Sequence, residues 1–222
     1  MTTQKLTKTD LWIPALLLVL SLVPAVGGIA RLASLSGDAP DDARFSHAPV
    51  PIVIHVISAT VYCLLGAFQF SSGFRLRWPA LHRRAGRWLM LCGLMAGATG
   101  FWMTATYAIP ASLQGPLLYG VRLAVAAAMV ASLLIGWRSI LRRDYSRHEA
   151  FMLRAYALGQ GAGTQVLVLL PWMLVSGESG GFVRDVLMTL SWAINLAIAE
   201  AVVRCRAPVG GAAADGMLGV TD

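Results

Sequence analysis

The chain has 222 residues, of which 57% are hydrophobic and 13% are charged, whereas about a quarter of the residues of a soluble globular domain are charged. With a mean hydropathy of +0.65, this composition excludes an ordinary soluble domain and indicates an integral membrane protein. The net charge of +7 does not indicate nucleic-acid binding, because a groove-sized domain with stacking aromatics is missing from the sequence.

Six apolar stretches follow one another along the chain, each long enough as a helix to cross a hydrocarbon core of about 30 Å. We predict membrane-spanning helices at residues 11–33, 50–70, 88–109, 116–137, 149–175 and 182–203. These stretches take up almost the whole chain, so no room remains for a separate soluble catalytic domain. The expected fold class is all-α, an integral membrane bundle of six transmembrane helices forming a single domain over residues 11–203.

Basic residues gather on alternate connections between these stretches. Thirteen of the 18 Lys and Arg residues lie in segments that six spans place on one side, namely Lys5, Lys8, Arg75, Arg77, Arg83, Arg84, Arg87, Arg138, Arg142, Arg143, Arg147, Arg204 and Arg206. The positive-inside rule predicts that this side, with the N-terminal segment 1–10 and the C-terminus, lies in the cytoplasm. The expected location is a bacterial cytoplasmic (inner) membrane, with anionic lipids as partners of the basic side.

Two segments outside the spans have a composition of their own. Residues 34–47 are polar, acidic and rich in turn formers, and are expected to form an external loop. Residues 204–222 form a cytoplasmic tail that is rich in Gly and Ala from residue 207 onward, and we expect it to be disordered.

The first span has two interpretations. Lys5 and Lys8, followed by an apolar stretch and Ala25-Val26-Gly27, are compatible with a cleaved signal peptide. The apolar run continues past this point through Ile29, which favours an uncleaved first helix. Cleavage would leave five spans and place the new N-terminus outside.

Polar side chains inside the second span form a stripe. His55, Tyr62 and Gln69, with Ala59 and Gly66 between them, recur at intervals of three and four residues and therefore share one helix face. Polar and small residues on one face are typical of an interhelical hydrogen-bond seam. The alternative is a lining for a ligand, a proton or a cofactor. Asn195 in the sixth span is a further candidate for such a polar seam.

Two charged residues lie inside the last two spans. Arg154 and Glu200 enter the membrane from the same side and, at about 1.5 Å per residue, reach similar depths. Unpaired charges in lipid are costly, so we predict an intramembrane ion pair between them. A structural role is favoured over a catalytic one.

The histidines bear on a possible haem site. His47 and His55 belong to the outer side, whereas His82 and His148 lie at the cytoplasmic mouths of the third and fifth spans. No two of them share the membrane interior, so a bis-histidine haem b buried between helices is not expected. His82 and His148, with Arg83 and Arg87 nearby, form a candidate cytoplasmic rim for an anion, a lipid or haem b.

No enzyme motif emerges from the sequence, which contains neither a Gly-rich phosphate loop nor a nucleophile elbow nor a His-Glu-x-x-His pattern. Cys63, Cys92 and Cys205 show no spacing typical of a disulfide framework or a zinc site. No catalytic residue, metal site or cofactor is therefore predicted.

Several motifs taken together point to a known family. They are His55 followed by Gly66-Ala-Phe-Gln69-Phe70, Pro79-Ala-Leu-His82-Arg83-Arg-Ala-Gly86-Arg87, His148-Glu-Ala-Phe-Met152-Leu-Arg154-Ala-Tyr156, and Trp192-Ala-Ile-Asn195 with Ala199-Glu200. Over roughly residues 50–203 the chain resembles the bacterial predicted membrane proteins filed as domain of unknown function 2306. The resemblance implies a multi-pass bacterial membrane protein and supplies no activity.

The interpretation favoured by the sequence is a non-enzymatic multi-pass protein with a polar intramembrane seam and a basic cytoplasmic rim. Two alternatives stay open. One is a membrane redox protein that binds haem or a quinone through its histidines, and the other is a small-solute or proton pathway along His55, Tyr62 and Gln69. An alternating-access transporter is disfavoured, because no pair of broken helices is evident in the sequence.

Overall fold

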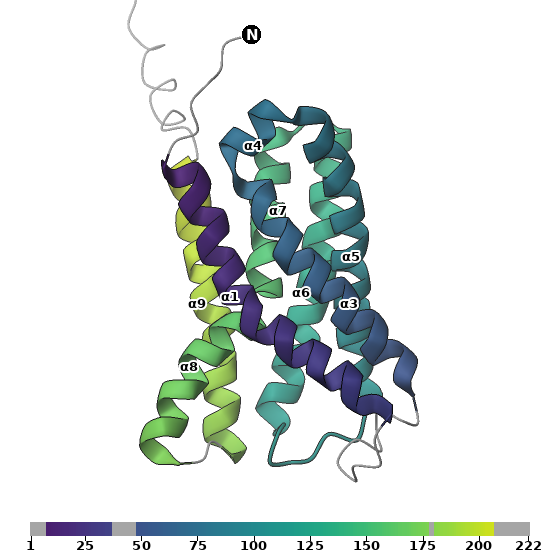
Figure 1. Ribbon diagram of the computed structural model, residues 1–222, viewed down its shortest axis with the longest axis vertical. Coiled ribbons are helices and arrows are strands. Elements are labelled where there is room, and N and C mark those ends of the chain that lie inside the picture. Colours follow the sequence, from purple (N-terminus) through teal and green to yellow (C-terminus); the bar gives the residue numbers. More distant parts are fainter. Residues whose placement is uncertain (1–7, 37–47, 178–179, 207–222) are drawn as a thin grey trace, which may run out of the picture.

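The computed structural model describes residues 8–36, 48–177 and 180–206, and this part of the chain is built of helices without a strand (Figure 1). In chain order the elements are α1 (Lys8–Ala33), the short 3-10 helix η1 (Ser34–Ser36), α3 (Pro49–Gly66), the 3-10 helix η3 (Ala67–Phe70), α4 (Ser72–Arg77), α5 (Pro79–Thr106), α6 (Pro116–Leu141), α7 (Tyr145–Gly159), α8 (Gly161–Ser176) and α9 (Gly181–Arg206).

Five of these segments are long and apolar enough to cross a membrane: α1, α3 with η3, α5, α6 and α9. Helices α7 and α8 meet at a bend of 42° and together form a sixth candidate span. The predicted all-α bundle is therefore confirmed, with five candidate membrane-spanning segments, or six if the bent pair is counted as one span.

The predicted boundaries need three corrections. The third span begins at Pro79 instead of residue 88, because Pro79 opens α5 at its first turn, so His82, Arg83 and Arg87 belong to a helix. The fifth span is not one continuous helix, since it is interrupted at Gln160. The predicted tail starts later than residue 204, because α9 runs to Arg206.

Parts of several predictions lie outside the described residues. These are the N-terminal segment 1–7, most of the loop 34–47 with His47, and the tail 207–222.

The two ends of the bundle differ in charge. The start of α1, the end of α9, α4 and the α6–α7 connection lie at one end (Figure 1). We call it the basic end. Besides Lys8 at the start of α1, its described basic residues are Arg75, Arg77, Arg83, Arg84, Arg87, Arg138, Arg142, Arg143, Arg147, Arg204 and Arg206. The α5–α6 and α8–α9 connections lie at the opposite end (Figure 1). The alternation predicted from the sequence thus collects these arginines at one end.

The helices pack in a ring. Helix α1 runs diagonally across the bundle (Figure 1) and contacts α3 and α8, while α5, α6 and α9 complete the circuit through contacts of α3 with α5, α5 with α6, α6 with α9 and α9 with α8. Helix α7 lies against α6 and α9. Apolar side chains such as Leu16 and Ile198, 69% and 60% exposed, face outward, as expected of a surface in contact with lipid.

Candidate functional site

The interruption between α7 and α8 lies at Gly159-Gln160-Gly161, in the middle of a span. A helix that ends inside a membrane leaves its last carbonyl groups without backbone partners, and lipid offers none. Side chains of two other helices hydrogen-bond these carbonyls: Asn195 Nδ2 to Ala157 O (3.0 Å), Trp192 Nε1 to Leu158 O (3.2 Å) and Cys63 Sγ to Gly159 O (3.5 Å). The break is therefore held open by specific partners on α3 and α9.

Gln160 extends this network to the first helix. Its Nε2 donates to Ser21 Oγ of α1 (2.9 Å) and to Tyr156 Oη (2.7 Å). Tyr156 Oη in turn donates to the backbone O of Cys63 on α3 (2.7 Å). The break in the fifth span thus links four helices, α1, α3, α7 and α9, through buried and partly buried hydrogen bonds.

Tyr62 of α3 lies at the same level, buried to 5% exposure. Its ring is possible there only because two neighbours are glycines: a Cβ on Gly93 would lie 2.8 Å from the ring, and one on Gly159 2.9 Å. Tyr156 lies beside it, with ring centroids 5.7 Å apart. The two tyrosines fill the centre of the bundle next to the break.

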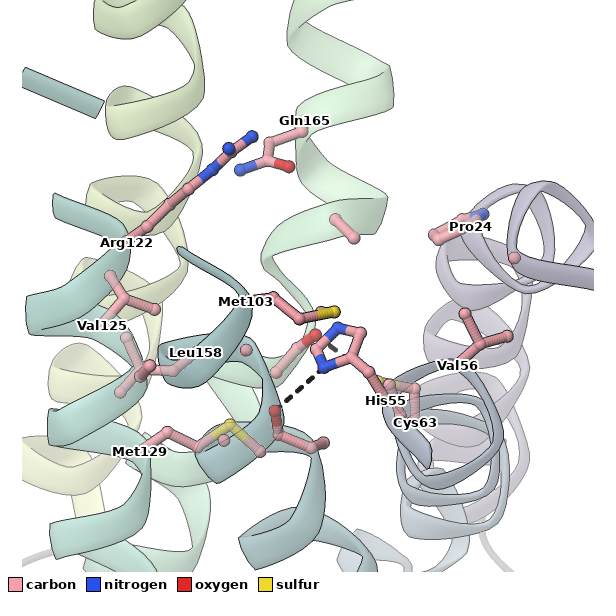
Figure 2. A pocket seen from close by; sticks show the side chains of 18 of the residues that line it. Pro24, His55, Val56, Cys63, Met103, Arg122, Val125, Met129, Leu158 and Gln165 are labelled. Carbon is pink, nitrogen blue, oxygen red and sulfur yellow. Dashed lines mark hydrogen bonds between the residues drawn. The ribbon is translucent and has the colours of Figure 1, made fainter. Parts of the chain in front are cut away.

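A cavity opens from Tyr62 toward the opposite end of the bundle, and we call it the His55 cavity. Its volume is about 520 Å³, and α1, α3, α5, α6, α8 and α9 all contribute to its wall together with Leu158, Gly159 and Gln160 at the break. Most of the side chains in Figure 2 are apolar, among them Met103, Val125 and Met129. Its polar groups include His55, Arg122, Gln165 and Arg184.

His55 is fixed in this cavity by α5. Its Nδ1–H donates to Ala96 O (3.0 Å) and to Thr99 Oγ1 (3.2 Å), and the Thr99 hydroxyl donates to Met95 O. In the neutral ring Nε2 is then the acceptor. His55 therefore has a fixed ring position at the wall of the cavity (Figure 2).

A second cavity, of about 550 Å³, opens from Tyr62 toward the basic end, and we call it the basic cavity. Its deep part is apolar and includes Phe70, Leu89, Leu133 and Met152, and its mouth carries Arg75, His82, Arg83, Arg87, His148 and Arg206. Glu149, the one acid among the described residues of this lining, forms an ion pair with Arg206. Positive charge at the mouth therefore exceeds negative charge.

The two histidines of this mouth differ in their hydrogen bonds. His148 Nδ1–H donates to Gly136 O of α6 (2.9 Å), which fixes the ring. His82 Nδ1 is buried and lacks a hydrogen-bond partner. Within the described residues no group of three or more His, Cys, Asp and Glu side chains is placed to hold a metal ion.

The structure brings Arg154 and Glu200 together. Arg154 Nε donates to Glu200 Oε1 (2.5 Å) and its Nη2 to Oε2 (2.9 Å), so the pair is bidentate. Neither residue lines either cavity. The pair joins α7 to α9 outside the two cavities.

The other predicted site residues separate into groups. His55 and Tyr62 of α3 and Gln69 of η3 all lie against α5. His55 lines one cavity, Gln69 the other, and Tyr62 both. Asn195 does not join this seam, because its side chain bonds Ala157 O and the hydroxyl of Thr164 (2.8 Å). His82, Arg83, Arg87 and His148 all line the basic cavity.

The sequence did not single out Gln160 or Asp185. Asp185, 1% exposed, lies in the first turns of α9 and accepts hydrogen bonds from Gly115 N (3.0 Å) and Leu118 N (3.1 Å) at the start of α6. The signal for Gln160 was a polar residue between two glycines inside an apolar run. The signal for Asp185 was an acid three residues past the start of a span.

The fold and these cavities define a polytopic helical membrane protein with cavities on both sides of a broken helix. The model of the family described as predicted membrane protein (DUF2306) matches residues 52–203. The chain therefore belongs to this family. No curated protein and no solved structure shows significant similarity to it.

Proposed function

We propose that this protein binds an amphipathic anion in the basic cavity, with the phosphate or carboxylate head at the mouth and the apolar body beneath it. The observation that supports this most strongly is the composition of the wall, where arginines at the mouth stand over an apolar interior that ends at Tyr62. Arginine binds phosphate and carboxylate groups through paired N–H donors. The buried, unpartnered His82 Nδ1 adds a polar group that such a head can satisfy.

The orientation in the membrane is part of this proposal. The positive-inside rule places the basic end in the cytoplasm of a bacterial cell, next to anionic lipids of the inner membrane. Cys205 is exposed near this end. A membrane-impermeant maleimide should label Cys205 only after the cells are opened, with Cys205→Ala as the control, whereas labelling of intact cells would reverse the orientation.

The binding test compares two lipids with the same tail. Lysophosphatidic acid, added to protein purified in a neutral detergent, is expected to raise Tm, and the corresponding monoacylglycerol, which lacks the phosphate, is expected to leave it unchanged. Arg83→Gln and Arg87→Gln should each weaken the response several-fold, because each removes a guanidinium from the mouth. Arg77→Gln is the matched control, since Arg77 belongs to the basic end but does not line the cavity. Equal responses to both lipids would contradict the proposal.

A second candidate occupant is haem b, and one observation favours it. His82 and His148 line the same cavity, and the Nδ1–H of His148 is bonded to a backbone carbonyl, which is the usual arrangement for a histidine that binds a metal through Nε2. Oxidised and dithionite-reduced absorption spectra of protein from haem-supplied cells test this candidate. A stoichiometric Soret band that is lost in His148→Ala would support it, and a featureless spectrum would contradict it.

A further inference from the structure

The wall of the His55 cavity contains a buried side-chain amide, Gln165, whose N–H donors have no acceptor among the described residues. Gln165 of α8 is 8% exposed, and its Nε2 has no hydrogen-bond partner. Buried polar groups are nearly always hydrogen-bonded, and an orphaned donor in a cavity wall is a strong indication of an absent acceptor. Figure 2 shows the side chains of Gln165 and Arg122 directed toward one another across the cavity.

Two arginines line the same cavity as this amide. Arg184 of α9 also lines the cavity, and its Nε is buried without a partner. Arg122 of α6 lines the cavity too, and its Nη1 donates to Gln114 Oε1 (2.5 Å). Among the described residues that form the wall there is neither Asp nor Glu. The neighbouring carboxylate of Asp185 is engaged by the backbone N–H groups of Gly115 and Leu118.

We propose that the His55 cavity is a second binding site, which takes the carboxylate of an amphipathic molecule between Gln165, Arg184 and Arg122. An anionic oxygen would accept from the free Nε2–H of Gln165 and the free Nε–H of Arg184, the two donors without a partner. The apolar tail lies along Met103, Val125 and Met129 (Figure 2). This site lies on the other side of Tyr62 from the basic cavity and is independent of the function proposed there.

Octanoate is a suitable probe, with octanamide as its neutral counterpart of the same length. Isothermal titration of the full chain in a neutral detergent should show binding of octanoate and none of octanamide. Arg184→Gln is expected to weaken octanoate binding about tenfold, the loss of one hydrogen bond to a charged group. Gln165→Glu keeps the size of the side chain and replaces the donor by an anion, so it should abolish binding. Gln165→Leu, which introduces no charge, should weaken it severalfold.

Thr106→Ala serves as the matched control. Thr106 is the last residue of α5, close to the cavity-lining residues Met103 and Thr104, but it does not line the cavity itself. Size-exclusion elution and Tm show that each variant is folded, and Gln165→Leu covers the case in which Gln165→Glu does not fold. Unchanged octanoate binding in Gln165→Glu and Arg184→Gln would overturn the proposal, as would equal binding of octanamide. Of the residues that the structure describes, the two cavities share only Tyr62, so an absent response to lysophosphatidic acid would count against the basic cavity alone.

Discussion

Arg154 attaches α7 to α9 through two hydrogen bonds to Glu200. Within α7 its guanidinium also lies over the ring of Phe151, at 4.9 Å from the centroid. Both charged side chains remain partly exposed, to 26% and 36%, on a part of the molecule that lines no cavity. Inside a membrane-spanning segment each of these charges is costly without its partner. The pair therefore acts as a packing element, and its removal tests that role without disturbing either cavity.

Arg154→Ala is expected to destabilise the protein by about 2 kcal/mol, the usual size of a hydrogen-bonded ion pair. Glu200→Ala should have a similar effect alone and little further effect once Arg154 is absent. Thermal unfolding of the two single variants and the double variant in a neutral detergent measures this coupling. Full additivity would mean that the pair contributes no interaction of its own.

Asp185 shows how a residue of one helix can cap another. Its buried carboxylate accepts from two backbone N–H groups at the start of α6, which would otherwise be unsatisfied. Asp185→Ala is expected to cost about 2 kcal/mol, as for the loss of a strong helix cap. Asp185→Asn, which keeps one acceptor oxygen, should cost about half as much. The Tm values of the two variants give the order, and equal losses would contradict this expectation, because the one acceptor oxygen that Asn retains would then contribute nothing.

At the scale of helices, the spans could be predicted from the sequence because each one depends on a run of about 20 apolar residues. Such a run is a local feature that can be identified from consecutive residues alone. The pairing of Arg154 with Glu200 was also within reach, because depth in a membrane can be counted along the chain. The break at Gln160 was not, since Gly159 and Gly161 are compatible with a continuous helix. The carbonyl groups at the break are hydrogen-bonded by Asn195, Trp192 and Cys63. These residues are far from the break in the sequence, so the sequence alone does not reveal the contacts.

Asn195→Leu tests whether these partners maintain the break. The change leaves Ala157 O without its donor and the Thr164 hydroxyl without its acceptor, at about 1–3 kcal/mol for each unsatisfied buried group. We expect faster amide exchange over residues 157–164, measured by hydrogen–deuterium exchange with mass spectrometry. Thr189→Ala is the control on the same helix, because its hydroxyl bonds only Asp185 O within α9. Unchanged exchange in Asn195→Leu would show that backbone geometry alone holds the break.

At the scale of the whole molecule, the two cavities enter from opposite ends and meet at one side chain. Tyr62 is the only described residue that lines both, and it lies between Gly93 and Gly159 beside the broken helix. Broken helices near the middle of a membrane commonly line solute sites. Tyr62 therefore lies between the two cavities.

Tyr62→Ala should join the two cavities, because it removes the ring that lines both. Gly93 and Gly159 beside this ring have no side chains that could fill the space. We expect proton leakage through proteoliposomes containing this variant to rise above that of the unaltered protein, since the joined cavities carry polar side chains on both sides of Tyr62, among them His55 and His148, that can hold water. Leakage is measured with an enclosed pH-sensitive dye under a potassium diffusion potential. Tyr62→Phe retains the ring and should leave the barrier intact. A folded Tyr62→Ala protein that is as tight as the unaltered one would mean that Tyr156, Leu133 and Leu89, which pack around Tyr62, seal the bundle without it.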